Sequence, residues 1–284
     1  MKHLFKYASL VIGIVLMLAF AAENKMADDL LFYASFDNGT SADVAVGDKN
    51  IYTADLRKNI ENAKPGLLNP DVVIANGKGL SGNALDFKKK SRMTTFFKAQ
   101  KNIGYSKENW SGAVSFWLQL DPEKDLEPGY CDPIQITDVN YNDAALWVDF
   151  TKNNPRNFRL GVLGDLEVWN PKKLGPDENK DYLRRLVTVE QPPFNRGEWT
   201  HIVINFSGLN TDNGSSELFV NGKSMGKVPT IEDPFTWNEE KANIMLGLNY
   251  IGLFDELAVF NRPLSTEEIE LIFNTKEGLK SILN

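Results

Sequence analysis

Tryptophans and polar side chains alternate with apolar residues in two segments, a pattern that could build a carbohydrate-binding surface. Around Trp117 and Trp147 every second residue is apolar, so in an extended chain the intervening side chains share the opposite face. Sugars bind through aromatic faces packed on their C–H surfaces, while amides and carboxylates hydrogen-bond their hydroxyl groups. With a further tryptophan from a rim loop, such a face predicts a binding groove. The candidate ligand-binding residues are Trp117, Gln119, Trp147, Asp149 and Trp169.

A competing interpretation keeps the same extended segments but closes the groove. Long loops could fold over the rings and bury them as a second apolar layer, because large aromatic side chains contribute strongly to cores. The alternation by itself leaves both outcomes open for Trp147 and Trp169. The exposure of these rings therefore decides between a groove and a second layer.

Few residues are available for nucleophilic or zinc chemistry. Beyond the first segment, the chain has one histidine, His201, and one cysteine, Cys131. A zinc site built from several histidines is therefore excluded, and a Ser-His-Asp triad would have to use His201. The sequence has no G-x-S-x-G elbow to supply the serine. We expect Cys131 to be an unpaired thiol in a loop.

The balance of charges argues against nucleic acid as a partner. The 284-residue chain has 31 Lys and Arg against 38 Asp and Glu, a formal charge of −7. Binding to phosphate backbones is instead driven by an excess of basic residues. The composition, 42% apolar and 24% charged, is that of an ordinary globular protein and excludes a disordered or collagen-like chain.

The first segment has the three-part layout of a secretory signal. Two lysines precede an uncharged apolar stretch over 10–20, which ends in the small-x-small pattern Ala19-Phe20-Ala21. The apolar run is shorter than the roughly 20 residues that span a bilayer. We expect 1–21 to be removed as a signal peptide, which predicts a secreted or periplasmic protein with no stable membrane span. An uncleaved membrane anchor is the alternative.

Short apolar runs with period two, separated by turn residues, predict that the rest of the chain is built from β-strands. About ten such runs without helical crossovers imply antiparallel sheets packed face to face. We therefore predict an all-β antiparallel sandwich. The strands are expected over 30–36, 113–120, 146–150, 157–163, 183–189, 201–206, 217–220, 244–248 and 252–260.

Two local signals complete this prediction. Asn221-Gly222 follows an apolar run and supplies the two residues that tolerate positive φ, which predicts a tight hairpin. Ser265 and Glu268 form a capping box ahead of an apolar helical face, which predicts a short helix near the C-terminus.

The chain shows no internal repeat, linker or low-complexity tract that would divide it. We expect one domain over 22–284. The stretches 121–142 and 170–180 lack periodicity and contain prolines and charges, which predicts long surface loops.

The order of these segments resembles the laminin-G-like jelly rolls of the concanavalin A-like lectin and glucanase superfamily. The most specific piece is 251–273, where a strand passes into Asn-Arg-Pro-Leu-Ser and then the short helix. Further pieces resemble the family's first strand, its glycine-rich segment, its W-x-H-V strand and its LYVNGK hairpin, at 31–37, 79–87, 197–203 and 217–223. The resemblance implies the jelly-roll fold, but this fold serves lectins, hydrolases, lyases and adhesion modules alike.

One acidic segment of the chain has the carboxylate spacing of the superfamily's glycosidases. These carry three carboxylates at i, i+2 and i+4 on one strand, so that all three point into the cleft. Glu123, Asp125 and Glu127 have this spacing, but prolines flank them and a lysine stands where the pattern has an apolar residue. We interpret them as a surface charge cluster. At the family's position, His201 is expected to be a structural imidazole hydrogen-bonded across the sheet, and the recurrent Trp117 to be buried.

The resemblance also implies a structural calcium site. In related jelly rolls, an acidic residue near the first strand and an aspartate near the last share an ion, since those two strands are neighbours. Asp37 and Asp255 are the matching positions, and carboxylate oxygens are the ligands that Ca²⁺ prefers. The alternative is that both are solvated, or that Asp255 caps the end of its strand.

Together these observations predict a secreted, non-catalytic carbohydrate-binding domain with a glycan or polysaccharide as partner and structural calcium. A protein-binding or adhesion module for another extracellular protein is the second hypothesis. A divergent glycoside hydrolase or polysaccharide lyase is the third.

Overall fold

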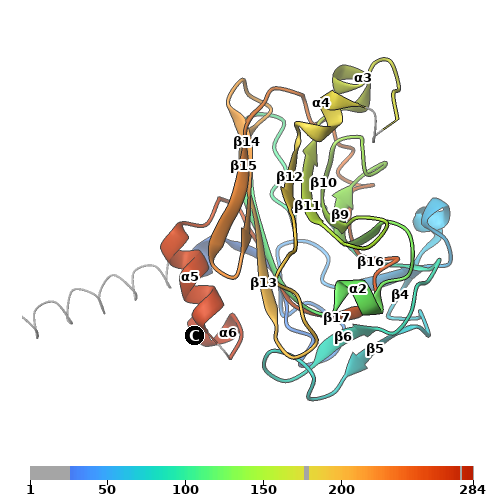
Figure 1. The fold of residues 1–284 in the computed structure, drawn as a ribbon. Helices are drawn as coiled ribbons and strands as arrows, with labels where there is room; N and C mark the ends of the chain where they lie inside the picture. Colours follow the sequence, from blue (N-terminus) through green and yellow to red (C-terminus); the bar gives the residue numbers. More distant parts are fainter. Residues whose placement is uncertain (1–25, 176–178, 276, 284) are drawn as a thin grey trace, which may run out of the picture.

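Two antiparallel sheets packed face to face make up most of the computed structural model, which describes residues 26–175, 179–275 and 277–283 (Figure 1). The predicted signal peptide over 1–21 lies outside these residues. No helix within the described ranges is long and apolar enough to cross a membrane.

The first sheet has nine strands among the described residues. In spatial order its main path is β15 (Lys223–Ile231), β14 (Gly214–Val220), β13 (Thr200–Leu209), β8 (Trp110–Gln119), β17 (Gly252–Phe260), β1 (Leu30–Ala34) and β2 (Val44–Ala45). Beside the first residues of β17 lies β6 (Ala84–Phe87), which pairs with β5 (Val72–Ala75).

The second sheet has eight strands in the same described part of the chain. Their order is β12 (Leu186–Val189), β11 (Phe158–Leu163), β10 (Ala145–Phe150), β9 (Cys131–Thr137), β16 (Asn243–Leu248), β7 (Thr94–Lys98), β3 (Ile51–Ala54) and β4 (Lys64–Pro65). The all-β antiparallel sandwich predicted from the alternation is thus confirmed.

The main core lies between the two sheets and takes every second residue of their central strands. Phe116 and Leu118 of β8 enter it from one side, and Leu146 and Val148 of β10 from the other. Because side chains alternate along a strand, the residues between them point away from the core. The outer faces of the two sheets are therefore on opposite sides of the molecule.

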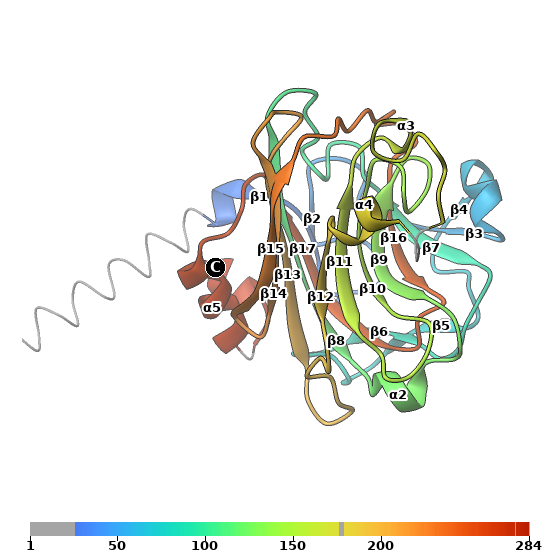
Figure 2. The same ribbon diagram turned by 45° about the horizontal axis from the view of Figure 1, so that its top comes forward.

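A short helix covers the outer face of the nine-stranded sheet. Helix α5 (Thr266–Asn274) starts at the predicted capping box, in which Ser265 accepts from Glu268 N at 3.2 Å and Glu268 accepts from Ser265 N at 2.8 Å. The helix lies beside this sheet (Figure 2), and its apolar side chains belong to a second cluster with residues of β8, β13 and β17. The chain then continues to α6 (Lys280–Leu283).

Loops with short helices flank the eight-stranded sheet. Helices α3 (Leu166–Trp169) and α4 (Lys180–Leu183) lie at one end of β10 to β12, as both views show (Figures 1 and 2). The 3-10 helix η1 (Arg57–Asn62) follows β3. Helix α2 (Pro122–Asp125) follows β8.

Several local predictions were wrong. The stretch 121–142 is not one loop, because it contains β9, a central strand. Pro133 concealed this strand, since proline lacks the N–H that a ladder needs; it is tolerated here at a bulge, where Asp132 and Pro133 together oppose Asp149. The strand expected over 183–189 begins only at Leu186. Strands before residue 100, apart from β1, were not predicted.

Candidate ligand-binding site

A row of charged side chains crosses the outer face of the eight-stranded sheet. Asp132, Asp149 and Arg159 come from the neighbouring strands β9, β10 and β11. Asp149 and Arg159 are directly opposite, and the guanidinium donates to both carboxylate oxygens, from Nε at 2.8 Å and from Nη2 at 2.5 Å. Both side chains are almost fully buried. This fork geometry fixes Asp149 and Arg159 as a pair.

An aromatic residue follows in the next row of the same face. Trp147 of β10 lies opposite Gly161 of β11, where a Cβ atom would come within 2.2 Å of the indole. Glycine is therefore needed at position 161, because it lets the indole lie across the neighbouring strand. The indole Nε1 donates to Tyr141 O at 2.7 Å, which fixes the ring in this position.

Loops cover one end of this face with further aromatic side chains. Tyr182 of α4 stacks near both Trp147 and Trp169, with ring centroids 6.4 and 6.0 Å apart. Trp169 of α3 donates its indole N–H to Asn142 O at 3.1 Å. As a result, Trp147 and Trp169 are both buried. The second aromatic layer that the sequence left open is present at this end of the sheet.

The loops do not fill the face completely, and a cavity of about 250 Å³ remains, hereafter the outer-face pocket. Tyr130, 36% exposed, lies at its edge, and the Arg159 guanidinium lies 5.0 Å from the centroid of the Tyr130 ring. The volume is slightly below the roughly 300–1,000 Å³ typical of ligand sites. The lining residues are Arg57, Tyr130, Asp132, Gln135, Tyr141, Trp147, Asp149, Arg159, Tyr182, Leu248 and Asn249.

Burial and mutual repulsion set the ionisation of the two aspartates. Burial raises the pKa of Asp132 well above its usual range, and the nearby charge of Asp149 raises it further. Burial also raises the pKa of Asp149, while Arg159 opposes this effect. With its amide oriented to satisfy its neighbours, Gln135 donates to Asp132 Oδ2 at 2.9 Å and accepts from Arg57 Nη2 at 2.5 Å. The pocket therefore has a connected polar floor.

The predicted groove residues divide between two faces, and the prediction of one groove was wrong. Trp147 and Asp149 line the outer-face pocket, with Trp169 behind Tyr182. Trp117 and Gln119 belong to β8, in the other sheet, so their outward face is on the opposite side of the sandwich. Alternation shows which side chains share a face of a strand, but not which sheet that strand joins.

On that opposite side, Trp117 is part of a covered aromatic stack. Its ring lies 4.6 Å from the ring of His201 and 6.1 Å from that of Phe273, which α5 supplies. His201 Nε2 hydrogen-bonds Ser115 Oγ at 2.9 Å, and burial lowers the pKa of His201 to about 3. The prediction of a structural imidazole hydrogen-bonded across the sheet is confirmed.

The remaining catalytic candidates do not converge. Position 125 ends the helical turn α2, so the period-two spacing of Glu123, Asp125 and Glu127 does not place them on one face. Asp125 is bound by Arg196, while Glu123 and Glu127 are exposed. Cys131 lies buried in β9 rather than in a loop, and burial raises the pKa of this unpaired thiol to about 12.

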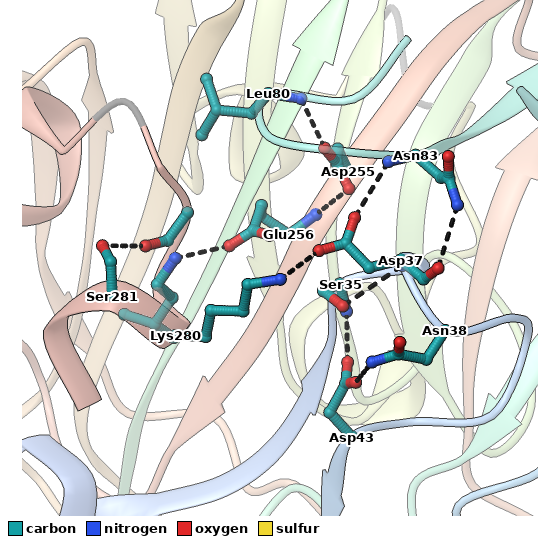
Figure 3. A network of polar contacts seen from close by, with 12 residues as sticks. Ser35, Asp37, Asn38, Asp43, Leu80, Asn83, Asp255, Glu256, Lys280 and Ser281 are labelled. Carbon is teal, nitrogen blue, oxygen red and sulfur yellow. Dashed lines mark hydrogen bonds and ion pairs between the residues drawn. The ribbon is translucent and has the colours of Figure 1, made fainter. Parts of the chain in front are cut away.

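The predicted calcium ligands do lie in one polar network, where Asp37 follows the end of β1 and Asp255 lies within β17 (Figure 3). Asp37 accepts from Asn83 N at 2.9 Å and from Lys280 Nζ at 2.5 Å. Asp255 accepts from Leu80 N at 2.7 Å and from Glu256 N at 2.8 Å. Each of these four carboxylate oxygens thus already has an N–H donor.

The same network contains a cation, Lys280, and a third carboxylate, Glu256. Glu256 accepts from the Tyr33 hydroxyl at 2.8 Å and from Leu279 N at 2.6 Å. Burial raises the pKa of Asp255 to about 9 and that of Glu256 to about 7, and neighbouring carboxylates add to both shifts. In the described residues, no group of three or more His, Cys, Asp or Glu side chains has the arrangement of a metal site. Arranged in this way, Asp37 and Asp255 do not fit a shared calcium ion.

Comparison with protein families identifies the fold. A family model described as the concanavalin A-like lectin/glucanases superfamily, of the laminin G type, matches residues 111–270, more than half of the chain. The chain belongs to this superfamily. The matched segment includes β8 to β17 and therefore most of the outer-face pocket. The comparison with curated proteins found no matching sequence.

Solved structures share the superfamily fold at low sequence identity. Domain 4 of a GH43 extracellular arabinanase from Geobacillus stearothermophilus, solved with arabinotriose, is 17% identical with a TM-score of 0.50, over 85% of this chain and 98% of that one. A structure of botulinum neurotoxin type C, whose cell entry depends on interaction with two ganglioside molecules, is 14% identical with a TM-score of 0.58; the match covers 89% of this chain and 52% of that one. The binding domain of botulinum neurotoxin DC, solved in complex with rat synaptotagmin II, is 12% identical with a TM-score of 0.56. The match covers 88% of this chain and 52% of that one.

These similarities establish the fold alone. The chain spans about half the length of the neurotoxin chains that it matches. What each of those proteins binds is a property of that protein.

Several residues of the pocket were not predicted from the sequence. Arg159 had a usable signal, because it alternates with Phe158 and Leu160 in a predicted strand and so faces away from the core. Asp132 was hidden by the missed strand β9. Arg57 carried no signal, since nothing in its own segment indicates that it meets Gln135, which is far away in the sequence.

Proposed function

We propose that this chain is a secreted, non-catalytic carbohydrate-binding domain that holds its glycan in the outer-face pocket. The supporting observation is the combination of aromatic walls with a charged, hydrogen-bonded floor in one cavity on the outer face of a sheet. Aromatic faces suit the C–H surfaces of a sugar ring, and the polar floor suits its hydroxyl groups. The glycan ligands of the arabinanase domain and of the type C neurotoxin are consistent with such a use of this fold.

Binding is favoured over hydrolysis by the state of the carboxylates. Glycoside hydrolysis generally uses two carboxylates, one as acid and one as base or nucleophile. In the lining of the outer-face pocket, as described, the carboxylates are Asp132 and Asp149, and Arg159 occupies both oxygens of Asp149. Only Asp132 is then available for chemistry. The arrangement suits the orientation of a ligand better than bond cleavage.

Secretion and a bound calcium ion are two further parts of the proposal. Secretion is supported by the signal-like layout of the first 21 residues. For calcium, Asp37 and Asp255 have suitable ligand chemistry, but Lys280 supplies the positive charge beside them. A bound ion would require the ammonium group to leave.

Affinity electrophoresis against a panel of polysaccharides tests the proposal, followed by calorimetry with oligosaccharides of any that retard the protein. Tyr130→Ala, at the exposed edge of the pocket, should lower affinity roughly tenfold without unfolding the protein. Val44→Ala is the matched control, because Val44 is 40% exposed and lies in the other sheet. Retardation by no polysaccharide, with or without calcium, would refute the proposal and favour a protein-binding module.

A further inference from the structure

A second cavity adjoins the outer-face pocket and shares part of its wall. Its volume is about 470 Å³, and Arg57, Leu248 and Asn249 belong to both cavities. We call it the basic pocket. Its lining residues are Leu56, Arg57, Lys58, Ser91, Arg92, Met93, Thr94, Leu248 and Asn249. A ligand in the outer-face pocket can therefore extend past Arg57 along the same face of the sheet.

The lining of the basic pocket has one sign of charge. Arg57, Lys58 and Arg92 contribute three cations, and the lining residues include no acid. This contrasts with the whole chain, whose formal charge is −7. A cleft lined by one sign of charge concentrates counter-ions of the opposite sign.

The cations of the basic pocket are only weakly neutralised: Asp132 in the adjoining outer-face pocket attracts the charge of Arg57 without forming an ion pair with it. Among the described residues, no carboxylate forms an ion pair with Arg57, Lys58 or Arg92. The acidic residue nearest in sequence, Asp55, accepts from Leu56 N at 2.8 Å and from the Asn59 side chain at 3.0 Å. The basic pocket therefore retains positive charge, mainly on Lys58 and Arg92, that no ion pair among the described residues neutralises.

Arg57 is held at the junction of the two cavities. Its guanidinium contacts Gln135, whose amide in turn bonds Asp132. A guanidinium has five N–H donors in a planar fork that matches carboxylate and sulfate groups. Gln135 occupies only part of this capacity. The remaining donors are available to a ligand that passes from one cavity to the other.

We infer that the ligand is an anionic glycan, with a sugar ring in the outer-face pocket and a carboxylate or sulfate group directed to Arg57 and the basic pocket. This inference rests on the proposed function, because it names the ligand class of the same site. Uronate and sulfate ester share the required chemistry, which is negatively charged oxygen on a sugar.

Matched pairs of polysaccharides test the inference. Polygalacturonate is compared with its methyl ester, and dextran sulfate with dextran, by affinity electrophoresis at about 50 and 300 mM salt. We expect at least tenfold stronger retention by one charged member than by its neutral partner, with the preference reduced at the higher salt concentration. The first pair reports on carboxylate and the second on sulfate.

Variants assign the preference to the basic pocket. The double variant Lys58→Ala/Arg92→Ala should lower affinity for the charged polysaccharide about tenfold and flatten its salt dependence, while leaving neutral glycans unaffected. Arg57→Gln should remove the preference for charge. Lys107→Ala/Lys172→Ala is the control, since both lysines are exposed and line neither pocket. Thermal melting of each variant verifies folding.

The outcomes separate this inference from the proposed function. Equal binding of charged and neutral partners, or a charge preference that survives in the basic-pocket variants, overturns the inference and leaves glycan binding intact. Failure to bind any polysaccharide overturns both.

Discussion

The outer-face pocket and the network around Asp255 contain similar groups but use them differently. Both place aspartates from different segments of the chain beside a cation. Around Asp255, loop 79–83, the backbone N–H of Glu256 and the C-terminal segment together supply an N–H donor to each oxygen of Asp37 and Asp255 (Figure 3). In the outer-face pocket, a cavity and partly used donors remain. Charges that saturate one another tie chain segments together, whereas charges beside a cavity remain available to a ligand.

Within the pocket, the Asp149–Arg159 pair resembles the network around Asp255, because each carboxylate oxygen has a donor. Its loss should have the largest effect on stability. Asp149→Ala leaves a buried guanidinium without its partner, so we expect a loss of about 3–5 kcal/mol in the free energy of unfolding. Urea denaturation measures it. Glu167→Ala is the control, because the Glu167–Lys173 pair is about 70% exposed and should contribute little. Similar losses in both variants would show that Asp149 and Arg159 are not a structural pair.

Features that depend on neighbouring residues in the sequence were predicted, whereas those that depend on contacts between distant segments were not. Period-two alternation predicted the core-facing and outward residues of β8, β10 and β13, and the capping box of α5 was predicted from Ser265 and Glu268. These signals are local. The pairing of Asp37 with Lys280, and the joining of the two cavities at Arg57, depend on contacts between segments that no local pattern connects.

The division of the predicted groove has the same cause. Trp117 and Trp147 have equivalent patterns, since each lies between core residues of a strand. The assignment of β8 and β10 to different sheets follows from how all seventeen described strands pair, which one segment does not determine. Burial of Trp147 likewise depends on Tyr182, from a separate loop.

The network around Asp255 should make the stability of the fold depend on pH. Burial raises the pKa of Glu256 from 4.5 to about 7, so between these values the folded state binds more protons than the unfolded state. Stability should therefore fall as pH rises from about 5 to 8, by at most about 3 kcal/mol for this group. Glu256→Gln should reduce this slope in urea denaturation at several pH values and leave the part due to Asp255, whose pKa burial raises to about 9. Glu270→Gln, an exposed control, should not.

A smaller effect is expected from the cation of that network. Lys280 is about half exposed, so its ion pair with Asp37 should contribute no more than about 1 kcal/mol. Lys280→Met should lower the melting temperature slightly and make it rise on addition of Ca²⁺. The melting temperature of the wild-type protein should change with neither Ca²⁺ nor EDTA. A Ca²⁺ response in the wild type as large as in the variant would mean that Lys280 does not take the place of an ion.

The smallest effect should come from Gln119, which the sequence placed in the same groove as Trp147. Gln119 lines a different cavity, beside Asp125 and Arg196, on the other sheet. Because the outer faces of the two sheets point in opposite directions, Gln119→Ala should change glycan affinity less than about twofold, against roughly tenfold for Tyr130→Ala. Calorimetry with the same oligosaccharide measures both variants. A larger loss of affinity in Gln119→Ala than in Tyr130→Ala would show that the glycan binds on the nine-stranded sheet, since only a ligand on that side could contact residue 119.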